Sequence, residues 1–113
     1  MSTALDNVVR GIYNIYMILP DPLSFQWDKG NVNKNLVKHG VSNQEIEEAF
    51  SDEAKVIYND TFHSELEGRY ILLGKTKFER FVYIVFAVRN SMVRVISARD
   101  LNRKEYKFYE KAT

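Results

Sequence analysis

The sequence contains no cysteine, and only two histidines and two prolines occur among its 113 residues. The missing cysteines exclude disulfides and thiolate metal sites. The formal net charge is +1, which is too small to draw the whole chain to nucleic acid or to an anionic membrane. No apolar run approaches the roughly 20 residues that cross a bilayer, and residues 1–24 lack the features of a signal peptide. These absences predict a cytoplasmic protein with no membrane partner.

The length and the hydrophobic content of 45% are those of one soluble domain with one core. The first 24 residues have little regular pattern, and Pro20 and Pro22 interrupt their one periodic piece, because proline cannot continue a helix or a strand ladder. We therefore expect residues 1–24 to form a poorly specified N-terminal arm. Met17 would serve equally well as the first residue of the chain. Residues 25–113 are predicted to form the domain.

A first helix is predicted from about Gly30 to His39. Asp28 is placed to cap its start, and Gly40 is placed to end it in the left-handed conformation. The apolar spacing assigns the side chains of this helix to two sides, with Val32 and Leu36 facing the core and Lys34, Asn35 and Lys38 facing solvent.

A second helix begins at the best-specified junction of the chain. Ser42 and Glu45 have the spacing of a capping box, in which each side chain bonds the other residue's backbone N–H. The hydrophobic staple around this box and the inward stripe of the helix are formed by Val41, Ile46, Ala49 and Phe50.

From residue 54 the pattern becomes extended, with strands predicted at 54–58, 69–76, 80–88 and 92–99. The segment 80–88 is apolar on both faces, as expected of a central strand. A last helix follows, capped by Asn102 and Glu105. The sequence therefore predicts a single α+β domain with two N-terminal helices, an antiparallel sheet of three to four strands and a C-terminal helix.

Two groups of polar residues each have a structural and a functional interpretation. Lys38 and His39 are favourable at a helix C-terminus, but they also offer a cation and a proton-transfer group. The loop residues His63, Glu65 and Glu67 match no zinc-site spacing, so we expect a solvated loop, no metal and no cofactor. Glu67 is also spaced to form an ion pair with Arg69.

Several segments, taken in order, resemble one known family. They are FQWD, NKNLVKHGVS with EEAF, HSELEGRYILLG, and VRVISARDLNRKE with Tyr109. Together they are similar to the BrnT family of bacterial toxins over residues 25–110. The resemblance implies a RelE-like fold and a ribonuclease from a type II toxin–antitoxin pair, which inhibits translation. It also implies a ribbon-helix-helix antitoxin, BrnA, as partner, RNA as substrate, and contact with DNA only through the antitoxin.

The chain departs from the family at one position. Many members have a lysine three residues after the aspartate of the WD pair, where this chain has Asn31. Lys29 lies nearby in sequence but on another face of the predicted helix. If that lysine helps to hold RNA, the departure bears on activity.

The chemistry of metal-free RNA cleavage indicates which residues could form the active site. Attack by the 2′-hydroxyl on the adjacent phosphate needs a base, an acid and fixed positive charge on the phosphorane oxygens. Arginine suits the last task, because its planar group matches two phosphate oxygens at once. The predicted site therefore consists of Arg69, Arg94 and Arg99 as phosphate ligands, His39 or His63 as the acid–base group and Lys38 as an auxiliary cation.

The spacing of two of these arginines sets a geometric condition. Arg94 and Arg99 are five positions apart, so a regular strand would send them to opposite faces. Both can serve one site only if a bulge intervenes or if Arg99 lies beyond the strand.

A second function from a different class has the same sequence support. A toxin-like protein without activity would act only as a binding module, together with its antitoxin in a DNA-bound repressor. A stand-alone RNA-binding domain is disfavoured, because no aromatic stripe of the RNP type is present. Incubating the purified protein with RNA in the presence of a chelator separates the enzyme from the module.

Overall fold

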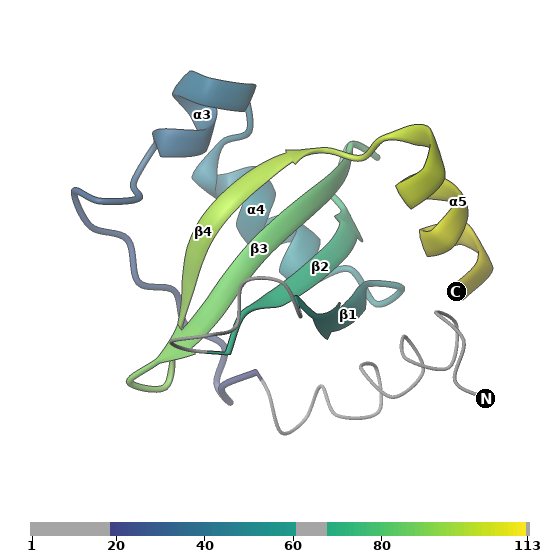
Figure 1. Ribbon diagram of the computed structural model, residues 1–113. Helices are drawn as coiled ribbons and strands as arrows, with labels where there is room; N and C mark the ends of the chain where they lie inside the picture. The colour runs from purple at the N-terminus through teal and green to yellow at the C-terminus, as the bar shows by residue number, and fades with distance from the viewer. Residues whose placement is uncertain (1–18, 61–67, 113) are drawn as a thin grey trace.

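The computed structural model describes residues 19–60 and 68–112. Its elements are, in chain order, α3 (Lys34–His39), α4 (Asn43–Phe50), β1 (Val56–Asn59), β2 (Tyr70–Lys75), β3 (Phe81–Arg89), β4 (Met92–Asp100) and α5 (Arg103–Ala112) (Figure 1). This order confirms the predicted α+β domain. Among the described residues, no helix has the length and apolar character needed to cross a membrane. The predicted arm falls mostly on residues 1–18, which lie outside the described part.

The four strands form one antiparallel sheet in the order β1-β2-β3-β4. One face packs against α4, and the opposite face packs against α5, so each face has its own apolar core. Interior positions of β3 are buried toward both faces, which confirms that the segment 80–88 is a central strand. The sheet has β1 at one edge and β4 at the other. The helix α3 lies beyond the outer edge of β4 (Figure 1).

The start of α4 confirms the predicted capping box. The backbone N–H of Glu45 donates to Ser42 Oγ at 3.1 Å, and the N–H of Ser42 donates to Glu45 Oε1 at 3.0 Å. The predicted inward residues of this helix are buried. A Cβ at Gly74 of β2 would lie 2.8 Å from the carbonyl oxygen of Ala49. Glycine at this position therefore allows α4 to lie directly on the sheet.

The first helix differs from its prediction. It is only six residues long, and its N-cap is Asn33 rather than Asp28. Val32 and Leu36, which the spacing placed in the core, are 42% and 47% exposed, while Asn35 is buried at 2%. The predicted sides were therefore wrong for Val32, Leu36 and Asn35, while Lys34 and Lys38 are exposed as predicted. Gly40 ends the helix in the left-handed conformation, also as predicted.

The outer edge of β4 explains why these sides are exchanged. An edge strand presents unpaired backbone groups, which must find partners. The amide of Asn31 donates to the carbonyl of Val95 at 3.3 Å, and Lys34 Nζ donates to the carbonyl of Ile96 at 2.9 Å. The oxygen of Asn35 accepts from the N–H of Ala98 at 3.0 Å. These polar side chains, which we call the α3 polar stripe (Asn31, Lys34 and Asn35), therefore face the sheet in place of apolar ones.

The C-terminal helix begins at the predicted pair. The N–H of Asn102 donates to Glu105 Oε1 at 2.9 Å, and the N–H of Glu105 donates to Asn102 Oδ1 at 2.8 Å. Tyr109 is buried against the sheet, and its hydroxyl donates to Asp52 Oδ2 at 2.7 Å. The hydroxyl bond fixes α5 to the turn that follows α4.

Candidate active site

A β-bulge in β4 satisfies the geometric condition that the sequence set. Phe86 pairs with Val95, and the preceding Val85 pairs with Ser97, so Ile96 is an extra residue without a partner on β3. A bulge of this kind changes the alternation of side chains beyond it. Arg94 and Arg99 therefore lie on the same face of the sheet although they are five positions apart in the sequence.

The face on which they lie follows from their neighbours. Val93, Val95 and Ala98 belong to the core beneath α4, and side chains alternate along a strand. Arg94 and Arg99, which alternate with them, thus belong to the opposite face, where α5 packs. Ser97 lies between the two arginines on this face, opposite Val85.

Arg69 joins the same face from the other side of β3. Its carbonyl accepts from the N–H of Asp60 at 2.9 Å, which continues the β1–β2 ladder by one residue. Tyr70 packs against the core beneath α4, so Arg69 belongs to the opposite face. The pairing of Tyr70 with Phe86 places Arg69 beside Ala87, the residue that also pairs with Arg94. Arg69 and Arg94 thus lie on either side of Ala87, a small residue of the central strand β3.

We call this set the arginine face (Arg69, Arg94 and Arg99). Arg99 pairs with Tyr83, four residues from Ala87 along β3. At 3.3 Å per residue the two ends of the face are roughly 13 Å apart along the strands. The structure therefore brings together the three arginines that the sequence singled out.

Arg94 is held by Asp28. Its Nη1 lies 2.6 Å from Asp28 Oδ2, and its Nη2 lies 3.2 Å from Oδ1. The hydrogen bond from Arg94 and the N–H of Gly30 hold the pKa of the Asp28 carboxyl below its usual value. From the sequence, Asp28 was predicted to cap the first helix, a common role for aspartate. No sequence signal linked it to Arg94, 66 positions away.

Arg99 is held in the same two-oxygen manner by Glu105. Both contacts, Nη1 to Oε1 and Nη2 to Oε2, are 2.8 Å long. The guanidinium also lies 3.9 Å above the centre of the Tyr83 ring. The hydrogen bond to Glu105 raises the pKa of Arg99 above its usual value. A carboxylate with two accepting oxygens here occupies the side of the guanidinium that a phosphate would use.

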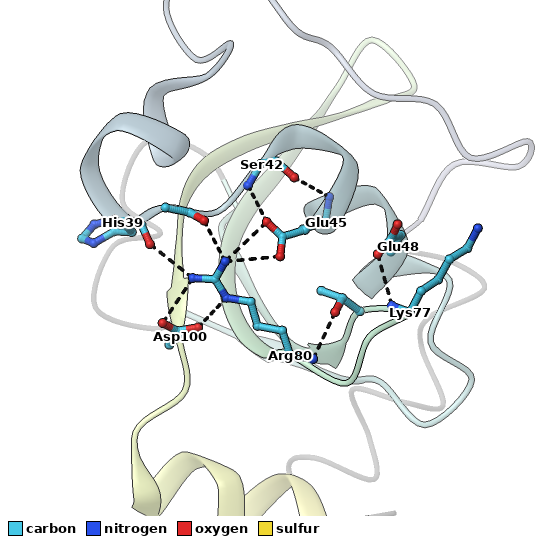
Figure 2. A network of polar contacts seen from close by, with 9 residues as sticks. His39, Ser42, Glu45, Glu48, Lys77, Arg80 and Asp100 are labelled. Carbon is cyan, nitrogen blue, oxygen red and sulfur yellow. Dashed lines mark hydrogen bonds and ion pairs between the residues drawn. The ribbon is translucent and has the colours of Figure 1, made fainter.

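Lys38 and His39 are not part of the arginine face. Both are exposed at the end of α3, where the His39 carbonyl accepts from Arg80 Nη2 at 3.3 Å. Figure 2 shows the His39 ring pointing away from that guanidinium. The other predicted acid–base residue, His63, lies outside the described residues, as do Glu65 and Glu67.

Sequence reasoning missed a polar network around Arg80 (Figure 2). Its guanidinium binds Asp100 with contacts of 2.7 and 3.2 Å, Glu45 at 3.2 Å and the carbonyl of Gly40 at 2.7 Å. These bonds join the end of α3, the start of α4 and the end of β4. With its donors directed at these groups, Arg80 has a structural role, and one arginine before an apolar strand gave no sign of it.

Metal binding finds no support in the part of the chain that the structure describes. Within residues 19–60 and 68–112, no group of three or more histidine and carboxylate side chains is close enough to hold an ion. The arginines of the arginine face supply fixed positive charge and hydrogen-bond donors.

The Arg99–Glu105 pair predicts a specific dependence of stability on pH. Burial alone would raise the pKa of Glu105, but the hydrogen bonds from Arg99 and the Asn102 N–H outweigh it and lower the pKa. A lowered folded-state pKa stabilises the fold above the unfolded value of about 4.3, and this contribution is lost as the pH falls through the folded-state value. Glu105→Gln should therefore melt below wild type at pH 7, with the difference shrinking below about pH 4.

Thermal melting from pH 7 to pH 3 measures this effect. Glutamine keeps the capping geometry, so the comparison isolates the charge. Glu79→Gln, at an exposed turn position, serves as the control for a general change of net charge. A melting difference that stays constant over the whole pH range would show that the charge of Glu105 is not the source of the stabilisation.

The comparisons with known proteins identify the family of the chain. No curated protein matches the chain. A family model described as the ribonuclease toxin BrnT of type II toxin–antitoxin systems matches residues 27–105. This segment runs from the residue before Asp28 to Glu105, and so it contains all three arginines and both of their carboxylate partners. Because the match covers most of its length, the chain belongs to the BrnT family of ribonuclease toxins.

Proposed function

We propose that the protein is an endoribonuclease toxin that cleaves RNA without a metal ion and thereby inhibits translation. The observation that carries this proposal is the bulge at Ile96, which places Arg94 and Arg99 on one face with Arg69. Three guanidinium groups along roughly 13 Å of sheet offer donors to successive phosphate groups of a single RNA strand.

The proposed reaction is attack by a 2′-hydroxyl on the adjacent phosphate. The charge that develops on the phosphorane oxygens is stabilised by arginine donors already aimed at a two-oxygen partner. In the proposed reaction phosphate displaces the two carboxylates. Asp28 is the more accessible of them, at 46% exposed, whereas Glu105 is 18% exposed and also caps α5. The 5′-hydroxyl leaves with a proton, and the other product ends in a 2′,3′-cyclic phosphate.

Proton transfer needs a group on the same face as the arginines. His39 lies with the Arg80 network at the end of α3, so we propose the other histidine of the chain, His63, for this role. His63→Gln is expected to slow cleavage, and His39→Gln serves as its matched control.

The test of the function is RNA cleavage under exhaustive chelation. Purified protein should cut RNA at the same rate in EDTA as in magnesium, and a 2′,3′-cyclic end should be found on the product. Arg99→Ala, purified in parallel, controls for a contaminating nuclease. Loss of cleavage in EDTA with recovery on adding zinc or magnesium would show that a metal performs the reaction.

We propose a ribbon-helix-helix antitoxin similar to BrnA as the partner. Membership of a type II toxin–antitoxin family supports an antitoxin partner. One observation favours the second function, a binding module that represses transcription with its antitoxin. Arg94 and Arg99 are each already satisfied by a carboxylate, as purely structural arginines would be. In that case wild-type protein would bind antitoxin and cut no RNA.

A further inference from the structure

The helix α3 is amphipathic in the reverse sense. Its polar stripe of Asn31, Lys34 and Asn35 bonds to the backbone of β4. The aliphatic side chains of this segment are on the surface: Val32, in the turn before α3, is 42% exposed, and Leu36 and Val37, in α3, are 47% and 86% exposed. Surface helices normally turn their apolar side toward the core.

This arrangement leaves three aliphatic side chains, within six residues of sequence, in contact with water. Exposed apolar groups that lie together and are rimmed by polar residues mark interaction sites. We call these three residues the α3 apolar surface (Val32, Leu36 and Val37). They are available for a partner because the inner side of the helix segment is committed to hydrogen bonds with the edge strand.

The charge around this surface defines the partner's chemistry. From position 29 to position 44 the chain has no acidic residue, and Asp28, directly before this stretch, is paired with Arg94. Lys29 and Lys38 therefore contribute positive charge here, whereas the ammonium group of Lys34 is bonded to the carbonyl of Ile96. The whole chain has a net charge of only +1, so this positive charge is local. A partner segment with an apolar stripe and acidic flanks complements both properties.

The exposed side chains also favour protein over RNA as the partner. Base recognition on single strands uses aromatic stacking, whereas valine and leucine offer aliphatic contacts only. An amphipathic helix binds through residues at i, i+3 or i+4 and i+7, which suits a short row of aliphatic side chains.

We propose that the α3 apolar surface binds an acidic amphipathic helix of the antitoxin. This inference rests on the proposed function, in that it names where the partner of the toxin binds. The helix α3 lies beyond the outer edge of β4 (Figure 1), whereas alternation along the strands places the three arginines on the α5 side of the sheet. Antitoxin binding and RNA cleavage can therefore be tested separately.

The experiment uses the full chain and, as the probe, a purified ribbon-helix-helix antitoxin of the BrnA type. Val37→Asp and Leu36→Asp each remove an aliphatic contact and place a negative charge against an acidic partner. We expect antitoxin affinity, measured by titration calorimetry, to fall at least tenfold. RNA cleavage and the melting temperature should remain as in wild type. Phe78→Asp is the matched control, because Phe78 is 93% exposed but lies in the turn between β2 and β3, and it should bind as wild type.

The result that overturns the proposal is wild-type affinity in both α3 variants. A fall in RNA cleavage with unchanged antitoxin affinity would also overturn it, because the surface would then belong to RNA. If wild-type protein binds antitoxin but cuts no RNA, the catalytic function fails while the affinities of the variants still decide the docking surface.

Discussion

Replacing Arg99 by alanine is expected to slow RNA cleavage by a factor of hundreds. Removing one preorganised donor from a developing oxyanion typically costs about 3–4 kcal/mol of barrier. Arg94→Ala and Arg69→Ala should have effects of the same order, since all three side chains belong to the arginine face. Lysine should rescue poorly at each position, because a point charge cannot bind two oxygens as the planar guanidinium does. Initial rates on a defined RNA strand measure the losses.

The ion pairs provide the controls that separate catalysis from folding. Asp28→Asn and Glu105→Gln remove the charge partner and keep the arginine, whose contacts with those carboxylates are 2.6 to 3.2 Å long. If the arginines act on phosphate, these two variants should still cut RNA at close to the wild-type rate.

The structural alternative makes the opposite prediction. If the arginines serve only to hold Asp28 and Glu105, each arginine variant should melt as early as the variant of its carboxylate partner. Arg99→Ala would then loosen the start of α5, because Glu105 also caps that helix. Arginine variants that melt early and still cut RNA at the wild-type rate would remove the catalytic assignment.

The parts of the fold that local chemistry determines were predictable. A capping box needs two residues three positions apart, and both predicted boxes are present, at Ser42–Glu45 and Asn102–Glu105. The four strands lie within two residues of their predicted bounds, because the chain leaves few polar residues inside them. In each case the evidence lay within one short window of sequence.

The prediction of α3 failed because its determinant is distant in sequence. Apolar spacing assigned Val32 and Leu36 to the core, but the helix packs on a strand edge more than 60 positions away. Such an edge needs donors and acceptors rather than apolar area, so asparagine is favoured there. No local pattern shows which helix will meet an edge strand.

In the candidate site, too, the features set by local sequence were predictable and those set by distant residues were not. The arginines could be named from their chemistry, and the need for a bulge could be stated from their spacing. The position of the bulge at Ile96 could not be predicted from the sequence, because it depends on pairing with β3 and on bonds from the α3 polar stripe. The carboxylates Asp28 and Glu105 were each explained by a helix cap, which concealed their contacts with arginine.

Replacing Asn35 by alanine is expected to destabilise the fold by about 1–3 kcal/mol, because the N–H of Ala98 would lose its acceptor at a buried site. For a domain of this size the melting temperature should fall by about 5–15 °C. Asn35→Leu should be no better, since leucine restores volume but cannot accept a hydrogen bond. Lys34→Met is the control within the same stripe, and its effect should stay below about 1 kcal/mol because the lysine is exposed.

The Asn35 variants also connect stability to the site, because Ala98 directly precedes Arg99 in β4. Loss of the bond from Asn35 frees the strand just beyond the bulge, so the direction of Arg99 is less well fixed. RNA cleavage should therefore fall in Asn35→Ala even at temperatures well below its melting point, whereas Lys34→Met should cut nearly as wild type. An Asn35→Leu protein that melts and cuts as wild type would show that the edge of β4 needs no acceptor from α3, and that the bulge is held by its pairing with β3 alone.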